Sequence, residues 1–103
     1  MKHGDIRWYG FPKPDKRRPV MILTRDSAIS YLNEITIAPI TTTIRDIPTE
    51  VLLTQADGMP RDCAISFDHI QTVQKRKIGG LITALNPRRF VEVSRAISFA
   101  LQL

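Results

Sequence analysis

The sequence predicts one small domain that is mainly β, with a single helix at its C-terminus. Three observations support this fold class: short apolar segments recur roughly every ten residues, turn-forming residues separate them, and only the last segment has helical spacing. A chain of 103 residues can build one modest core and is too short for two. We therefore expect a single domain over residues 1–103, folded as a small curled or barrel-like antiparallel sheet.

The first half of the chain contains three expected strands. Residues 4–10 alternate in polarity and carry aromatic side chains, and the three prolines of segment 11–19 then predict an exposed loop. Residues 19–24 (PVMILT) are continuously apolar, which is typical of a strand buried on both faces. The polar segment 25–34 allows a short helical turn, and residues 35–40 (ITIAPI) resume the strand pattern.

The second half supplies three further strands. They are expected at residues 49–54, 63–68 and 69–75, where β-branched and apolar residues recur between turn signals. The adjacent glycines of IGGL (78–81) predict a turn after the last of them.

The tail has the pattern of an amphipathic helix. Asn86 can cap the helix, and Pro87 suits its first turn. Residues that should pack on the sheet recur at helical spacing: Phe90, Val93 or Ser94, Ile97 and Leu101.

The composition favours a cytoplasmic protein with a polyanionic partner. Fifteen Lys and Arg against ten Asp and Glu give a net charge of +5, which suits nucleic acid, anionic lipid or an acidic protein. The sequence has neither a run of about 18 apolar residues nor an apolar stretch behind its charged start, so we expect no membrane span and no export. The single Cys63 cannot form an internal disulfide and fits a reducing compartment.

The sequence lacks the residue patterns of several kinds of functional site. His3 and His69 lie far apart, and neither has a Cys or carboxylate at ligand spacing, so we expect no metal site and no cofactor. The sequence also has no glycine-rich phosphate loop. Cys63 begins an apolar strand-like segment, which favours burial over a role as nucleophile.

Arginine and threonine are the remaining candidates for chemistry, and they suit a reaction at phosphorus. Cleavage of RNA through its own 2′-hydroxyl needs no protein nucleophile and no metal ion. The protein must align the attacking oxygen, stabilise charge on the phosphoryl oxygens and move protons. A guanidinium offers a planar fork of donors to phosphate, and a threonine hydroxyl can add another donor.

Four segments of the chain resemble those of the MazF/PemK toxins, endoribonucleases of bacterial toxin–antitoxin systems. They are GDI at 4–6, the loop ending in KRRPV, APITT at 38–42, and SFDHIQTVQKRKIGGL at 66–81. Their order, spacing and fit to the total length make the combination fairly specific. The resemblance implies an SH3-like barrel of the CcdB/PemK type, a homodimer, and an acidic antitoxin whose peptide covers the RNA groove.

The resemblance also implies an active site. The family's arginine, which precedes the proline that opens the second strand, corresponds to Arg18, and its threonine, in a Pro-apolar-Thr segment, corresponds to Thr41. The implied activity is metal-independent cleavage of single-stranded RNA at a short sequence, leaving a 2′,3′-cyclic phosphate and a 5′-hydroxyl. Arg18 would first stabilise charge, with proton transfer as the alternative, because arginine normally stays protonated. Thr41 would hold a phosphoryl oxygen or help to protonate the leaving 5′-oxygen.

Other residues are candidates for contacts with RNA. Lys16, Arg17 and Arg45 suit the phosphate backbone, and Tyr9 and Phe11 could stack on bases. Trp8 could stack as well, although strand alternation equally favours core packing. Acid or base catalysis by His3 or His69 is an alternative that only the intrinsic chemistry of histidine supports.

The residues also allow two other functions. A CcdB-like poison shares the barrel and binds DNA gyrase without chemistry, but it relies on a C-terminal tail that contains Trp, and the only Trp here is Trp8. A non-catalytic RNA-binding barrel is the second alternative, because Arg and Thr at suitable positions do not by themselves make a working site.

Overall fold

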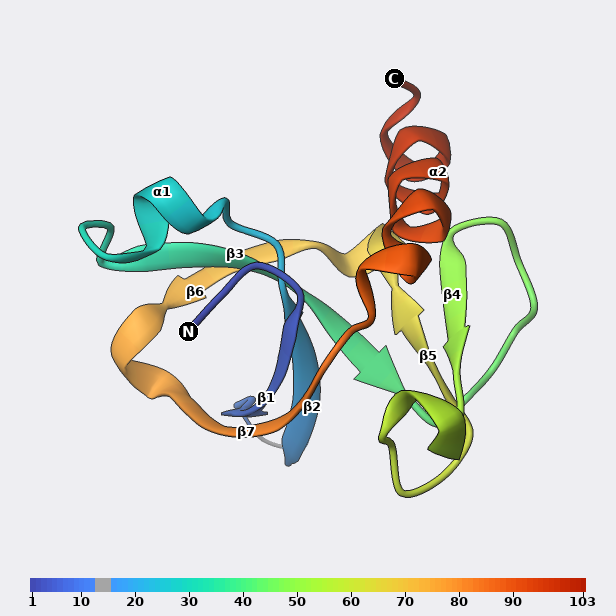
Figure 1. The fold of residues 1–103 in the computed structure, drawn as a ribbon, viewed down its shortest axis with the longest axis horizontal. Helices are drawn as coiled ribbons and strands as arrows, with labels where there is room; N and C mark the ends of the chain where they lie inside the picture. Colours follow the sequence, from blue (N-terminus) through green and yellow to red (C-terminus); the bar gives the residue numbers. More distant parts are fainter. Residues whose placement is uncertain (13–15) are drawn as a thin grey trace.

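The computed structural model describes residues 1–12 and 16–103, so part of the predicted loop 11–19 (residues 13–15) lies outside the described residues. The strands are β1 (Asp5–Gly10), β2 (Arg17–Ile22), β3 (Glu34–Thr41), β4 (Glu50–Leu53), β5 (Cys63–Ser66), β6 (Gln71–Gln74) and β7 (Ile78–Ala84). The helices are α1 (Asp26–Ile29) and α2 (Phe90–Leu101), with short 3-10 turns η1 (Gln55–Asp57), η2 (Phe67–His69), η3 (Lys75–Lys77) and η4 (Pro87–Arg89). The predicted fold class, mainly antiparallel β with a C-terminal helix, is confirmed. Figure 1 shows α2 beside β4 and β5, with its C-terminal end pointing away from the strands.

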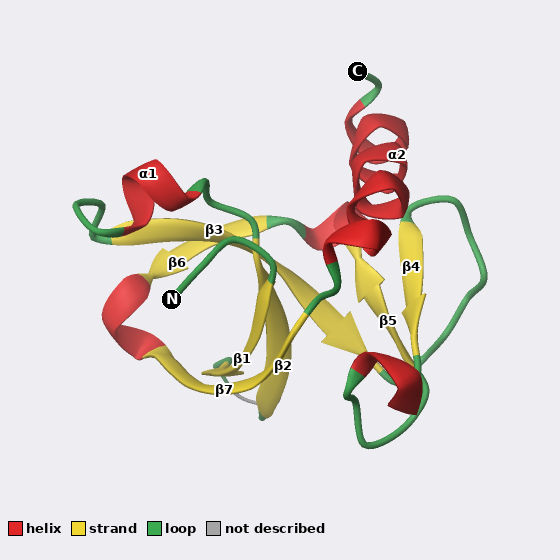
Figure 2. Cartoon of the chain, in the orientation of Figure 1, coloured by secondary structure: helices red, strands yellow, loops and turns green. Residues whose placement is uncertain are grey.

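Strand β3 joins the two parts of the curled sheet. The strand order is β4-β5-β3-β2-β1-β7, with β6 also paired to β3, and every pairing is antiparallel. The first half of β3 pairs with β6, as in Ile35 with Val73, whereas its end pairs with β5, as in Thr41 with Ala64. Both ends of β3 therefore position neighbouring strands, and Figure 2 shows it running across the sheet from α1 toward β5.

Strand β2 separates two apolar cores. Val20, Met21 and Ile22 are all fully buried, although neighbouring strand residues point to opposite faces. Met21 packs into a first core that α2 covers with Val93, and Val20 and Ile22 pack into a second. The prediction of a strand buried on both faces is confirmed.

The turn predicted at residues 78–81 is wrong, because these residues begin β7. This strand pairs with β1, with register shifts that let it bend around its neighbour. A Cβ atom on Gly79 would lie 3.3 Å from the carbonyl oxygen of Trp8. The glycine therefore permits a close approach of two backbones instead of a reversal of the chain.

Several element boundaries also differ from the prediction. β2 begins at Arg17, so Arg18 lies within the strand, paired with Tyr9, instead of in the loop before it. The segment 67–70 between β5 and β6 contains the 3-10 turn η2 where two adjoining strands were predicted.

The C-terminal helix differs from the prediction in where it begins and in part of its buried face. The Asn86 side chain accepts a hydrogen bond from the Arg88 amide at 3.0 Å, but it caps the 3-10 turn η4, and α2 follows from Phe90 with no side-chain cap of its own. Val93 is buried, as expected, whereas Leu101 is 54% exposed, so its predicted packing on the sheet is wrong. No helix in the described part of the chain is long and apolar enough to span a membrane.

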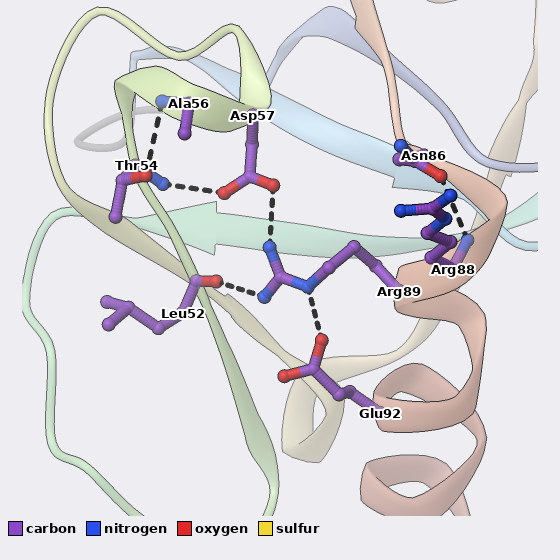
Figure 3. Close-up of polar contacts among 8 residues, drawn as sticks. All are labelled: Leu52, Thr54, Ala56, Asp57, Asn86, Arg88, Arg89 and Glu92. Carbon is purple, nitrogen blue, oxygen red and sulfur yellow. Dashed lines mark hydrogen bonds and ion pairs between the residues drawn. The ribbon is translucent and has the colours of Figure 1, made fainter.

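Arg89 fastens the start of α2 to the sheet, as Figure 3 shows. Its Nη1 atom lies 2.6 Å from Oδ1 of Asp57, its Nη2 donates to the Leu52 carbonyl at 2.7 Å, and its Nε contacts the Glu92 carboxylate. Asp57 also accepts a hydrogen bond from the Thr54 amide at 2.9 Å. Burial alone would raise the pKa of the Asp57 carboxyl, but the Thr54 amide and the Arg89 guanidinium together lower that pKa below its usual value.

Candidate active site

One groove gathers polar side chains from distant parts of the chain. Its volume is about 400 Å³, and its lining residues are Phe11, Arg18, Pro39, Thr41, Arg45, Ser66, His69 and Gln71. The two residues expected to be catalytic, Arg18 and Thr41, thus line the same groove from neighbouring strands.

The groove lies at one end of the second core, where the apolar residues of that core give way to polar ones. Strand alternation puts Arg18 on the same face of β2 as Val20, which the pairing places opposite Pro39 on β3. Thr41 follows on the Pro39 face of β3. Val20 is fully buried, whereas Arg18 is exposed and Thr41 half-buried. The same alternation that builds the core therefore delivers a guanidinium and a hydroxyl to its open end.

The Thr41 side chain is oriented by its own turn. Its Oγ1 accepts a hydrogen bond from the Thr43 amide at 3.1 Å. Because that contact uses the oxygen as an acceptor, the hydroxyl hydrogen remains able to donate to a phosphoryl oxygen.

The loop that carries Arg45 is tied down by Glu50. The Glu50 carboxylate accepts hydrogen bonds from the backbone amides of Arg45 at 2.9 Å and Asp46 at 3.2 Å. Asp46 has a positive φ of 54°, which aspartate tolerates better than most residues. Glu50 thereby fixes the sharp bend that brings Arg45 to the groove.

The turn η2 brings His69 to the groove and is anchored on both sides. Phe67 is 1% exposed in the first core, and the Thr49 hydroxyl donates to the Asp68 carboxylate at 2.6 Å. The Gln71 side-chain amide donates to the His69 carbonyl at 3.2 Å. His69 is itself exposed on a turn whose flanking residues are held in place.

Sequence reasoning missed part of the groove lining. Ser66 and Gln71 were not among the predicted site residues, and His69 was only an alternative without a location. The signal that could have found them is their place in SFDHIQ, at the junction between two strands that both pair with β3.

The residues predicted to contact RNA do not all lie together. Phe11 and Arg45 line the groove. Tyr9 is only 9% exposed, and its ring packs edge-on against Phe11 at a centroid distance of 4.9 Å. Tyr9 therefore supports Phe11 from beneath, and any contact of its own with RNA stays a prediction.

Lys16 directly precedes β2 and Arg17 begins it. Both are exposed, and neither is among the groove-lining residues. The Arg17 guanidinium stacks over the Trp8 ring at 4.7 Å, a cation–π contact. Trp8 lines a neighbouring cavity of about 240 Å³ that also includes Thr41. The contacts of Lys16 and Arg17 with RNA stay predictions.

Cys63 and His3 lie outside the groove. Cys63 is buried, as expected, and burial raises the pKa of its thiol, with smaller contributions from Asp57 and Asp62. His3 uses its ring to hydrogen-bond the Leu23 carbonyl and to pack on Phe90. Over residues 1–12 and 16–103, no group of three His, Cys, Asp or Glu side chains is placed to hold a metal ion.

Comparison with known proteins gives a consistent family. A family profile described as a PemK-like, MazF-like toxin of type II toxin–antitoxin systems matches residues 2–101. Endoribonuclease MazF3 of Mycobacterium tuberculosis is 40% identical over 77 residues, which cover 71% of this chain and 75% of that protein.

Solved structures agree with the sequence comparison. Mycobacterium tuberculosis toxin MazF-mt6 superposes with a TM-score of 0.89 at 34% identity, covering 96% of this chain and 97% of that one. An endoribonuclease in complex with its cognate antitoxin, from a mycobacterial species, has a TM-score of 0.87 at 21% identity, covering 100% of this chain and 96% of that one. At that identity the second likeness concerns the fold alone.

Proposed function

The chain belongs to the PemK-like, MazF-like endoribonuclease toxins of type II toxin–antitoxin systems, and from this premise we propose that it cuts single-stranded RNA in the groove between β2, β3 and η2. The cut is sequence-specific and inhibits translation and growth. The observation that carries the proposal is the meeting of Arg18 and Thr41 in one groove with Arg45.

The proposed chemistry uses the RNA 2′-hydroxyl as nucleophile. Its oxygen attacks the adjacent phosphorus, the bond from phosphorus to the 5′-oxygen breaks, and the products carry a 2′,3′-cyclic phosphate and a 5′-hydroxyl. The Arg18 guanidinium stabilises negative charge on the phosphoryl oxygens, and Thr41 donates a hydrogen bond to one of them. This division of roles requires no metal ion, because fixed donors supply the charge stabilisation.

The RNA strand would extend beyond the groove in both directions. Arg45 suits a phosphate next to the scissile one, and Phe11 presents a ring on which a base can stack. Lys16 and Arg17 would hold phosphates along the exposed side of β2, with Tyr9 as the support for Phe11.

An acidic antitoxin is the proposed protein partner. A net charge of +5 and the arginines of the groove suit a peptide rich in Asp and Glu, which would compete with RNA for the same surface. A protein of the same fold has been solved in complex with its cognate antitoxin, which makes this kind of partner reasonable here.

We also propose that the chain forms a homodimer and works in the cytoplasm, where both RNA and antitoxin are made. The outer side of α2 and the residues after it expose large apolar side chains that a second copy could cover: Val91, Phe99, Leu101 and Leu103.

The test is cleavage of a mixed-sequence RNA by purified protein in the presence of EDTA, with the ends mapped. Discrete cuts with 5′-hydroxyl ends are expected, and they should disappear in Arg18→Ala but persist in Arg76→Ala, which removes an equal charge from exposed η3. Cleavage that EDTA abolishes would overturn the metal-free chemistry. The absence of cuts on several RNAs would overturn the nuclease assignment, and DNA gyrase would then be the next target to test.

A further inference from the structure

We propose that His69 is the general base of the cleavage reaction, taking the proton from the attacking 2′-hydroxyl. This inference rests on the proposed function and adds a catalytic residue to it. Its starting point is that His69 lines the same groove as Arg18 and Thr41.

Among the residues that the structure describes, the other side chains lining the groove cannot readily exchange a proton near neutral pH. Arginine keeps its proton, the hydroxyls of serine and threonine keep theirs, and amide, proline and phenylalanine side chains do not titrate. Histidine is the side chain suited to gain and lose a proton between pH 5 and 8. The residues excluded in this way are Phe11, Arg18, Pro39, Thr41, Arg45, Ser66 and Gln71.

The position of His69 is fixed without use of its ring. Phe67 anchors η2 in the core, Asp68 is held by the Thr49 hydroxyl, and the His69 carbonyl accepts from the Gln71 side chain. Within residues 1–12 and 16–103, no hydrogen bond engages the imidazole. A ring that is carried by an anchored turn and keeps both nitrogens available is suited to act on a bound substrate.

Two guanidinium groups share the groove with the imidazole. They belong to Arg18 on β2 and Arg45 on the 42–49 loop, the charged residues besides His69 among the described lining residues. Both can hold phosphate oxygens of the RNA close to the imidazole. The nearest carboxylate along η2, that of Asp68, accepts the Thr49 hydroxyl, so it is engaged by another group.

In the proposed step, His69 takes up one proton and then returns it. A ring nitrogen of His69 accepts the 2′-hydroxyl proton while the bond from the 2′-oxygen to phosphorus forms and the bond to the 5′-oxygen breaks. The leaving 5′-oxygen takes a proton from water, and the resulting hydroxide takes the proton back from the imidazolium. Arg18 and Thr41 stabilise the phosphoryl oxygens throughout, so no proton has to leave the guanidinium.

The experiment compares His69→Gln with the wild-type protein across pH 5 to 9 on an RNA substrate that the wild type cuts. At pH 7.5 we expect kcat/KM to fall on the order of 100-fold or more. In the wild type, log kcat/KM should fall with a slope of one on the acidic side, and His69→Gln should lose this limb. His3→Gln is the matched control, because it removes the other histidine, which lies outside the groove, and it should retain the wild-type profile. Circular dichroism verifies that each variant is folded.

A substrate with sulfur in place of the 5′-oxygen separates a base from an acid. A thiolate leaves without protonation, so removal of a general acid would cost nothing on this substrate, whereas removal of a general base would cost as much as before. We expect His69→Gln to be slowed by a similar factor on both substrates.

Two results would overturn the inference while leaving the nuclease function intact. One is wild-type cleavage and an unchanged acidic limb in His69→Gln. The other is restoration of the wild-type rate on the sulfur substrate, which would make His69 an acid. A wild-type protein that cuts no RNA would overturn the proposed function and this inference together.

Discussion

Arg18 on β2 and Thr41 on β3 line one groove, although the strands that carry them are joined by the whole α1 segment. If each contributes one donor to the phosphoryl group, removal of either should reduce cleavage on the order of 100- to 1,000-fold. Thr41→Ser should retain most of the activity because it keeps the hydroxyl, whereas Thr41→Val should lose it. Initial rates on a short RNA check both changes. Equal activity of the Ser and Val variants would remove Thr41 from the chemistry.

The hydrogen bond from the Arg45 amide to Glu50 predicts a role for Glu50 at a distance from the RNA. Glu50→Ala should loosen the bend that carries Arg45 and raise KM on the order of tenfold, with a smaller change in kcat. Glu50→Gln keeps an oxygen acceptor for the same two amides and should behave almost like the wild type. Separate measurement of kcat and KM decides the matter, since a pure loss of kcat would contradict a positioning role.

The contact between Asp57 and Arg89 predicts a pH-dependent stability. The pKa of Asp57 lies below its usual 3.8 in the folded state, so the ionised carboxylate stabilises the fold at higher pH. This contribution should be complete above about pH 5 and lost as the pH falls below 3.8 through the lower folded-state pKa. Asp57→Asn should lower the free energy of unfolding by about 1 to 3 kcal/mol at pH 7 and flatten the dependence of that free energy on pH.

Denaturant unfolding from pH 2 to 7 measures this effect. Asp62→Asn, at an exposed position, serves as the control for the loss of one carboxylate and should follow the wild-type curve. If the unfolding free energy of Asp57→Asn varied with pH as steeply as that of the wild type, other carboxyl groups would be the cause of the acid sensitivity.

A side chain at position 58, which is glycine, should destabilise the fold for two reasons. Gly58 has a φ of +93°, and a Cβ atom there would lie 2.5 Å from Oγ1 of Thr83. Gly58→Ala should lower the free energy of unfolding by about 1 to 3 kcal/mol. Combination with Thr83→Ala removes Oγ1 but leaves the Thr83 Cβ atom at 2.9 Å, so it should recover part of the steric cost and none of the cost of the positive φ. Gly10→Ala, where nothing lies within 4 Å, should cost little in comparison.

The proposed homodimer predicts a charge-sensitive interface on α2. Phe99 is 63% exposed, so Phe99→Asp should leave the fold intact yet convert the dimer to a monomer. Light scattering after size-exclusion chromatography gives the mass of both proteins at matched concentration. A wild-type monomer would contradict the homodimer, and a dimeric Phe99→Asp would place the interface elsewhere.

The strand pattern was predictable where local chemistry decides the structure. The apolar run at Val20, Met21 and Ile22 and the Asn86 cap could be inferred from neighbouring residues alone. The structural role of Gly79 could not be inferred in this way. It depends on the backbone of Trp8, which is distant in sequence and comes close only after β1 and β7 have paired.

The site was predictable in part for a similar reason. Arg18 and Thr41 follow from a resemblance in short segments. The place of His69 in SFDHIQ marks a strand junction, but it does not by itself show that this junction reaches the same groove. The position of His69 depends on η2, a turn held by Thr49 and by Phe67 in the core. A turn of this kind is specified by tertiary contacts, which a one-dimensional pattern does not contain.

The bond from Arg89 to the Leu52 carbonyl has a consequence for aggregation. β4 is an outermost strand of the sheet, and such strands offer unpaired backbone groups to strands of other molecules. Arg89 occupies one of these carbonyls and is itself held by Asp57. Intermolecular growth of the sheet at this edge would first have to displace an ion pair, so the protein can accumulate with less risk of forming fibres.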